Sequence, residues 1–232
     1  MASTRARAWL GVWLLAASPA SGGELDAAAV LDRLQEWLDG TTTLESRFEQ
    51  TLVSGALGGG LSERGRLYLE RPGRMRFDYN EPEKKVAIVD GERTWLYLAA
   101  DRQLLLGRLD GEGELLPALL AGRRPLDEIF DATVEGSVPV VQGRYRLALR
   151  PRGSTDAVER VVVTLRAPLF AIDAAEILDA AGNRMDYTFT GQRRNVGLPR
   201  GAFGFAPPAG TEVSGSHEET VDPGVESRET GW

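Results

Sequence analysis

The chain has 232 residues and a formal net charge of −7, with 42% hydrophobic and 26% charged residues. This is an ordinary globular composition, and an all-β domain of this length can be a single unit. The absence of cysteine and the single histidine, His217, exclude disulfide scaffolds, zinc clusters, thiol nucleophiles and a histidine-dependent triad outside the C-terminal tail. The acidic balance argues against nucleic acid as a partner, because phosphate binding needs a concentrated basic surface.

The beginning of the chain has the pattern of a secretory signal peptide. Arg5 and Arg7 precede the apolar run 8–17, and small residues follow. This combination is typical of exported proteins, whereas a membrane anchor needs roughly twenty apolar residues. We therefore expect residues 1–22 to be a signal peptide, cleaved near Ala20. No cysteine follows the run to carry a lipid, so we expect a soluble mature protein.

An amphipathic helix is predicted over residues 25–39. Its apolar residues recur with the helical period and form one stripe: Val30, Leu31, Leu34, Trp37 and Leu38. We expect Gly40 to end the helix in a left-handed conformation, which glycine adopts without steric cost.

From Thr43 onward, short extended runs alternate with turn residues, which indicates an antiparallel sheet or barrel. The expected strands are 43–54, 62–70, 74–80, 85–90, 93–98, 103–108, 131–136, 144–150, 158–166, 172–179 and 184–191. Residues 115–130 break this rhythm, and we expect a short helix or two there, because Pro117 suits a first helical turn and Gly122 a stop. The polar, acidic segment 214–232 is predicted to be a disordered tail.

One face of the predicted sheet collects large apolar and aromatic side chains. They are Leu67, Leu69, Met75, Phe77, Tyr79, Val86, Ile88, Trp95 and Tyr97. Two interpretations stay open, a filled barrel core or a lined apolar cavity. One long helix and a few short ones must cover about eleven strands, which leaves room for a cavity. Periodicity alone does not decide between them.

The known catalytic motifs are missing from the sequence. There is no G-x-S-x-G elbow, no H-E-x-x-H and no Walker loop. The glycine-rich segment 55–60 is expected to be a hairpin tip between two strands, and 110–114 lacks the ligand spacing of a calcium loop. We assign no catalytic residue, no metal site and no cofactor.

The strand–turn–strand segment 65–77, with its turn Arg71-Pro72-Gly73-Arg74, resembles the periplasmic outer-membrane lipoprotein carrier family, LolA. Other segments follow in the family order: Phe48-Glu49-Gln50, Val89-Asp90-Gly91 with Thr94-Trp95-Leu96-Tyr97, Pro117 to Leu120, and Phe203-Gly204-Phe205-Ala206-Pro207-Pro208-Ala209-Gly210. The resemblance covers roughly residues 25–213. The residue matching Met75 is often aromatic in the family, and the acidic tail is not part of the family pattern.

The resemblance implies a mainly β fold, an incomplete antiparallel β-barrel of about eleven strands with an α-helical lid. We expect residues 23–213 to form this carrier domain. Such a protein carries acylated lipoproteins across the periplasm, from an inner-membrane ABC transporter to an outer-membrane receptor, and we expect a monomer.

The resemblance also assigns roles to residues. The cavity would be lined by Phe48, Leu67, Leu69, Met75, Phe77, Tyr79, Val86, Ile88, Trp95 and Tyr97. The lid would contain Leu31, Leu34, Leu38, Leu119 and Leu120. The arginine that matches Arg71 bonds to the lid in the family and favours its closed state, a role that suits a guanidinium with five donors.

Other functions remain open on the same scaffold. One is a lipoprotein receptor or sensor, although the missing lipidation cysteine argues against an anchored receptor. Another is a carrier or sensor of a different lipid or hydrophobic ligand, because an apolar wall does not encode the identity of its guest. A lipid hydrolase would need a nucleophile and a base, and the sequence identifies neither.

Overall fold

The computed structural model describes residues 25–55, 60–108, 119–120, 124–135, 143–153 and 158–215. The predicted signal peptide, residues 216–232 of the predicted tail, Pro117 and the acidic segment 110–114 lie outside the described residues. Their assignments stay predictions.

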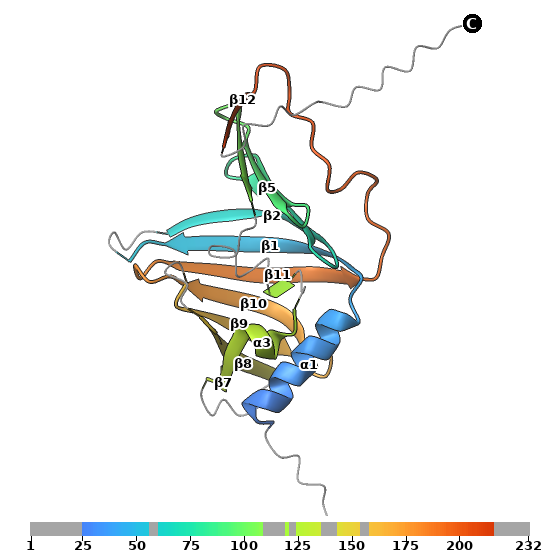
Figure 1. Ribbon diagram of the computed structural model, residues 1–232, viewed down its shortest axis with the longest axis vertical. Helices are drawn as coiled ribbons and strands as arrows, with labels where there is room; N and C mark the ends of the chain where they lie inside the picture. The colour runs from blue at the N-terminus through green and yellow to red at the C-terminus, as the bar shows by residue number, and fades with distance from the viewer. Residues whose placement is uncertain are drawn as a thin grey trace, which may run out of the picture.

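The described strands form one sheet of twelve, in the order β12-β6-β5-β4-β3-β2-β1-β11-β10-β9-β8-β7 (Figure 1). Neighbouring strands are antiparallel except β12 and β6, which are parallel. The bounds are β1 (Thr43–Val53), β2 (Gly60–Glu70), β3 (Arg74–Glu81), β4 (Lys85–Val89), β5 (Arg93–Leu98), β6 (Gln103–Arg108), β7 (Phe130–Val134), β8 (Arg144–Pro151), β9 (Arg160–Arg166), β10 (Ala171–Leu178), β11 (Arg184–Arg194) and β12 (Glu212–Gly215). The open, mainly antiparallel sheet confirms the predicted fold class, and all eleven predicted strands are present.

The twelfth strand was not predicted from the sequence. Ser214 and Gly215, assigned to the tail, belong to β12 and pair with Leu105 and Leu106 of β6. A four-residue strand whose partner lies more than a hundred residues away has no local pattern to reveal it. Its last residue must be glycine, because a Cβ atom on Gly215 would lie 2.1 Å from the carbonyl oxygen of Leu106.

Helix α1 (Ala27–Asp39) confirms the predicted amphipathic helix. It begins at Asp26, whose side chain accepts a hydrogen bond from the Ala29 N–H at 2.8 Å. Its whole apolar stripe is buried, with exposed fractions between 0 and 7%, because this stripe faces the sheet and covers its inner side.

The predicted left-handed end of α1 was wrong. Gly40 has φ −75°, and the Thr41 hydroxyl and Arg194 Nη2 both donate to the carbonyl oxygen of Trp37, at 2.6 and 3.2 Å. These donors satisfy one of the carbonyl groups at the end of the helix. A Cβ atom at position 40 would lie 2.9 Å from Arg194 Nη2, so a larger residue here would make the end of this arginine side chain shift.

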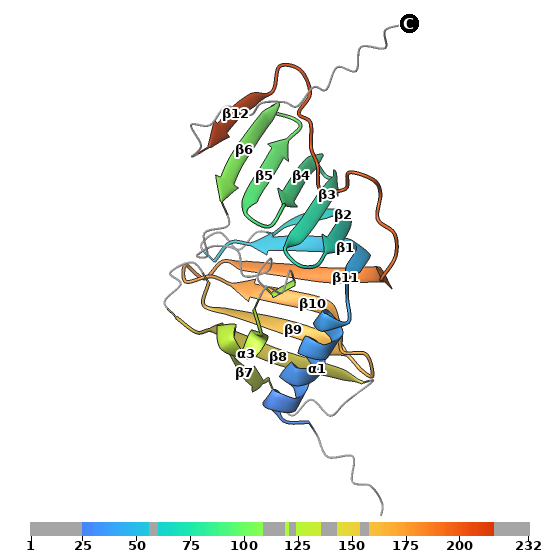
Figure 2. The same cartoon turned by 45° about the vertical axis from the view of Figure 1, so that its right-hand side comes forward.

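The sheet curls, and the helices cover only part of its inner face. Helix α1 contacts β7, β8 and the short helix α3 (Leu126–Ile129), whereas β3 to β6 and β12 extend beyond the helices (Figure 2). The Leu126 N–H donates to Gln35 Oε1 at 2.9 Å and joins the two helices. Helix α3 and the helical residues Leu119 and Leu120 agree with the short helices expected within 115–130. In the part of the chain that the structure describes, no helix has both the length and the apolar character needed to cross a membrane.

Candidate functional site

The helical half of the inner face is filled by side chains. The expected lid residues are all buried and belong to one apolar cluster with the sheet: Leu31, Leu34, Leu38, Leu119 and Leu120. Phe48, Leu67 and Leu69, which the sequence assigned to the cavity wall, lie on the inner face within this cluster and are 3, 1 and 0% exposed. In this conformation they face packed side chains rather than open space.

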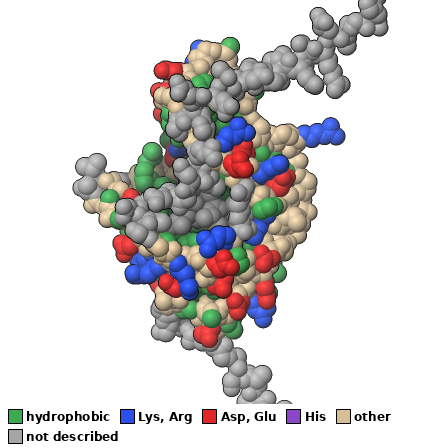
Figure 3. Space-filling model, in the orientation of Figure 1, with side chains coloured by type: hydrophobic (Ala, Val, Ile, Leu, Met, Phe, Trp, Pro, Cys, Tyr) green, Lys and Arg blue, Asp and Glu red, His purple; other side chains and the backbone are tan. Residues whose placement is uncertain are grey.

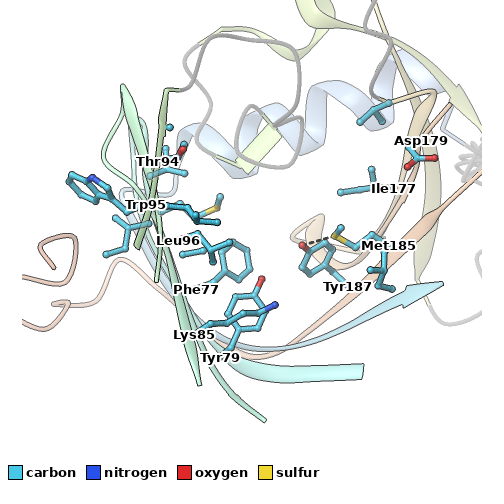
Figure 4. Close-up of a pocket in the computed structure, with 18 of the residues that line it drawn as sticks. Phe77, Tyr79, Lys85, Thr94, Trp95, Leu96, Ile177, Asp179, Met185 and Tyr187 are labelled. Carbon is cyan, nitrogen blue, oxygen red and sulfur yellow. Dashed lines mark hydrogen bonds between the residues drawn. The ribbon is translucent and has the colours of Figure 1, made fainter. Parts of the chain in front are cut away.

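Beyond the helices the inner face borders a hollow of about 640 Å³, between β3–β6 and the ends of β10 and β11 (Figure 4). Its volume is in the range of about 300–1,000 Å³ that is usual for sites of small ligands. Met75, Phe77 and Tyr79 lie on its wall, as expected from the sequence. The wall also includes Leu52, Lys85, Ala87, Ile88, Val89, Thr94, Trp95, Leu96, Leu105, Leu106, Gly107, Val158, Ile177, Asp179, Asn183, Arg184, Met185 and Tyr187.

The strand register corrects the expected facing of β4 and β5. Phe77 pairs with Ala87, and Ala87 pairs with Leu96, so these three side chains share the inner face. Because side chains alternate along a strand, the side chains of Val86, Ile88, Trp95 and Tyr97 belong to the opposite face. Ile88 and Trp95 contribute atoms to the wall, but Figure 4 shows the Trp95 ring directed away from the hollow.

Trp95 and Tyr97, which the sequence assigned to the inner face, have partners on the outer face. The Tyr97 ring lies 4.9 Å from the Phe205 ring, and the Arg93 guanidinium lies 5.6 Å from the Trp95 ring. The C-terminal segment therefore covers part of this outer face. The large rings of Trp95 and Tyr97 suggested that these side chains point to the inner face of the sheet. However, a turn that changes the register by one residue reverses the two faces of the following strand.

An aromatic layer joins the packed core to the hollow. The Phe48 ring meets the rings of Phe77 and Tyr79 edge to face, with centroids 5.0 and 4.9 Å apart. Phe77 also lies 6.0 Å from Tyr187 on the other side of the hollow. Edge-to-face pairs of this kind add about 0.5–1.5 kcal/mol beyond the burial of their surface. The aromatic layer is therefore a well-packed base of the hollow, and we call it the floor.

Polar side chains form a cluster at the edge of this floor. Lys85 Nζ lies 2.6 Å from Glu63 Oε1, and the Tyr79 hydroxyl donates to Gln50 Oε1 at 2.9 Å. Lys85 Nζ is also 4.2 Å from the centre of the Tyr79 ring. Burial, with the nearby Glu63 carboxylate, raises the pKa values of the Tyr79 and Tyr187 hydroxyls above their usual range. Both hydroxyls therefore stay protonated at neutral pH.

This polar cluster was not predicted from the sequence. Glu63 and Lys85 are 22 positions apart and lie on strands that are not neighbours in the sheet. Charged residues near strand ends are ordinary, and their sequence positions carried no signal that they would pair.

Arg71 lies between the sheet and the cover. Its side chain is 9% exposed, and Nη2 lies 3.4 Å from Oδ1 of Asp39, the last residue of α1. Burial lowers the pKa of the Arg71 guanidinium, and the Asp39 charge opposes that effect. The arginine therefore reaches the end of the helix that the sequence assigned to the lid.

The hollow opens at the surface near the β1–β2 hairpin. Leu52 on its wall is 39% exposed, and its partner across the strands, Leu61, is 53% exposed. Figure 3 shows Lys, Arg, Asp and Glu side chains on both halves of this face, with hydrophobic side chains scattered between them. Among the residues that the structure describes, no group of three or more His, Asp or Glu side chains could hold a metal ion.

A curled sheet with one half closed by helices and an apolar hollow in the other half defines a protein that can shelter an apolar chain. Residues 39–206 match the family described as "Outer membrane lipoprotein carrier protein LolA". That match covers most of the chain, so the chain belongs to the LolA family.

Full-length relatives agree with this assignment. The chain is similar to an outer-membrane lipoprotein carrier protein of Chromobacterium violaceum, at 29% identity over 86% of this chain and 95% of the relative. It is also similar to the protein of that name from Cupriavidus taiwanensis, at 30% identity over 80% and 88%. A solved structure of an uncharacterized conserved protein from Thermus thermophilus has a TM-score of 0.51 at 16% identity, covering 81% of this chain and 97% of that chain, and shares the fold.

Proposed function

We propose that the protein is a lipoprotein carrier, which shelters the acyl chains of lipoproteins released from the inner membrane and delivers them to the outer membrane. The observation that carries the proposal is the apolar hollow of about 640 Å³ beside a helical cover. The names of the full-length relatives support the same function and do not favour a carrier of another ligand.

The energetics explain why such a carrier needs a cover. Each methylene group of an acyl chain that leaves water contributes about 0.8 kcal/mol. A carrier that held two or three chains as tightly as a membrane does could not release them. A cavity that binds the acyl chains with moderate affinity, because the protein's own side chains fill part of the same space, allows transfer to a more apolar acceptor.

We propose that cargo displaces the cover and gains access to the packed part of the inner face. Phe48, Leu67 and Leu69 would then join Met75, Phe77 and Tyr79 as contacts of the acyl chains. The polar contacts that oppose this opening include the Gln35–Leu126 hydrogen bond, the Arg71–Asp39 ion pair and the hydrogen bond from Arg194 to the Trp37 carbonyl. Each is worth about 0.5–1.5 kcal/mol or less, so cargo can displace them.

The pathway around the carrier follows from the same proposal. The protein would act in the periplasm, accept cargo from an inner-membrane ABC transporter and pass it to an outer-membrane receptor. Residues 1–22 would direct export, and 23–213 would carry the cargo, with β12 extending this domain through Gly215. We assign the chain no catalytic step.

The test is mass spectrometry of molecules that co-purify with the protein from the periplasm. Intact acylated lipoproteins are the expected result. Free lipid without attached protein would instead favour a carrier of another lipid, and soluble peptides alone would contradict both. A preparation of the same protein stripped of ligand in urea and refolded serves as the control for the mass of the bare chain.

A further inference from the structure

Polar side chains interrupt the apolar wall of the hollow, and three of them form one cluster: Tyr79, Lys85 and Tyr187. Tyr79 and Lys85 are cross-strand partners on β3 and β4, and Tyr187 faces them from β11 (Figure 4). Polar groups in an apolar site are unfavourable unless they have partners. These three side chains face the hollow, where a bound ligand would meet them.

The hydrogen-bond acceptors of this cluster lie behind the wall and do not border the hollow. Lys85 Nζ contacts both carboxylate oxygens of Glu63, at 2.6 and 2.8 Å, and Tyr79 donates to Gln50 Oε1. Glu63 and Gln50 are 7 and 6% exposed, and neither is among the described residues that line the hollow. The single Tyr79 proton is already donated to Gln50, so at this cluster the wall offers a ligand two donors, the Lys85 ammonium and the Tyr187 hydroxyl.

The Tyr187 hydroxyl has a partner that a ligand can replace. It donates to Met185 Sδ at 3.0 Å. A thioether sulfur is a weak acceptor and the methionine side chain is flexible. A carbonyl oxygen in the hollow would be a stronger acceptor for the same proton.

The donor group carries no net charge. The Glu63 carboxylate neutralises the Lys85 ammonium. The other charged residues on the wall, Asp179 and Arg184, have partners of their own: Asp179 accepts two hydrogen bonds from Asn183, and Arg184 pairs with Asp186. A ligand that ends in a carboxylate or phosphate would meet a lysine whose charge is already compensated.

We propose that Lys85 and Tyr187 donate hydrogen bonds to the uncharged carbonyl oxygens of ester- and amide-linked acyl groups, with the Tyr79 ring positioning Lys85, and that this subsite disfavours chains ending in a carboxylate. An ester carbonyl accepts hydrogen bonds, donates none and carries no charge, so it fits a neutral group of donors. The subsite would place the linkage of the acyl chain at the polar cluster and the hydrocarbon along Ala87, Leu96 and Ile177. This inference rests on the proposed function, because it describes the same hollow.

The test compares three chains of equal length: methyl dodecanoate, dodecyl methyl ether and dodecanoate. Each displaces an apolar fluorescent dye from the full chain at neutral pH. We expect the ester to bind about 2- to 10-fold more tightly than the ether, as one or two hydrogen bonds predict, and more tightly than the carboxylate. Tyr187→Phe removes one of the two donors, so it should lower ester affinity toward that of the ether and leave the ether unchanged.

Two further variants sharpen the result. Glu63→Gln leaves the lysine charge uncompensated, so dodecanoate should bind several-fold more tightly while the ether is unaffected. Tyr145→Phe removes a hydroxyl from a half-buried ring that stacks on Phe170, away from the hollow wall, and should change none of the three affinities. Unfolding midpoints establish that each variant is folded.

Equal binding of ester and ether by the unmodified protein would overturn the subsite, as would an ester preference that Tyr187→Phe leaves undiminished; either result leaves the proposed function intact. Failure of the dye and of all three chains to bind would overturn the proposed function, and the subsite with it.

Discussion

Replacing Arg71 with leucine should make the protein hold its cargo and slow delivery. The guanidinium connects the β2–β3 turn to the end of α1, with Nη2 3.4 Å from Asp39 Oδ1. The arginine side chain is 9% exposed but its partner is 61% exposed, so solvent screens the pair and limits it to about 1 kcal/mol. Leucine removes this tie and adds apolar surface beside the cover.

The size of the effect follows from the energy of the closed state. If the empty, closed form loses up to about 1 kcal/mol, cargo no longer has to break the ion pair, and its affinity rises up to about 5-fold. The assay loads the purified carrier with a fluorescent triacylated lipopeptide and follows transfer to acceptor vesicles. The expected result is a transfer rate reduced by a similar factor.

A neighbouring arginine provides the matched control. Arg74 lies in the same turn, is 51% exposed and pairs with Glu70 at 2.8 Å, so Arg74→Leu should transfer cargo at the unmodified rate. Asp39→Asn removes the Arg71–Asp39 ion pair without adding apolar surface. It should therefore slow cargo transfer only by the part that comes from losing the ion pair. Transfer by Arg71→Leu at the rate of the Arg74→Leu control would refute the reasoning.

Three other predictions test the wall and its floor. Phe77→Ala removes the centre of the aromatic layer and should lower the free energy of unfolding by about 3–5 kcal/mol, measured by urea denaturation; a loss near zero would show that the floor is not packed. Ala87→Leu should narrow the hollow and weaken binding of an apolar dye, whereas Val86→Leu on the opposite face should not; equal effects would contradict the register. The pKa values of Tyr79 and Tyr187 are raised in the folded state, so their stabilisation is complete below the unfolded value of about 10 and is lost as the pH rises above it. Urea midpoints should therefore fall between about pH 9 and pH 11, and Tyr79→Phe should weaken that dependence; an unchanged slope would exclude this cause.

Local patterns were enough for most of the secondary structure. The stripe from Val30 to Leu38 predicted α1, because residues three and four apart meet on one side of a helix whatever the rest of the chain does. The alternation of Met75, Phe77 and Tyr79 placed β3 and its inner face correctly. The turn at Arg71 and the C-terminal phenylalanines carried the family resemblance, and through it the fold.

Relations between distant strands were decided only in the tertiary structure. The faces of β4 and β5 depend on the register of two turns, and a shift of one residue would have put Trp95 in the hollow in place of Leu96. Likewise, the Glu63–Lys85 pair exists because β2 and β4 both flank β3.

The amino-acid sequence by itself determined a mainly β chain with one amphipathic helix, and it predicted a signal peptide for export, since these properties depend on neighbouring residues. It did not determine which half of the inner face is packed, how large the hollow is, or that its wall presents donors. Those properties arise when side chains from β1, β3, β4 and β11 meet, and the curvature of the whole sheet sets how closely they approach.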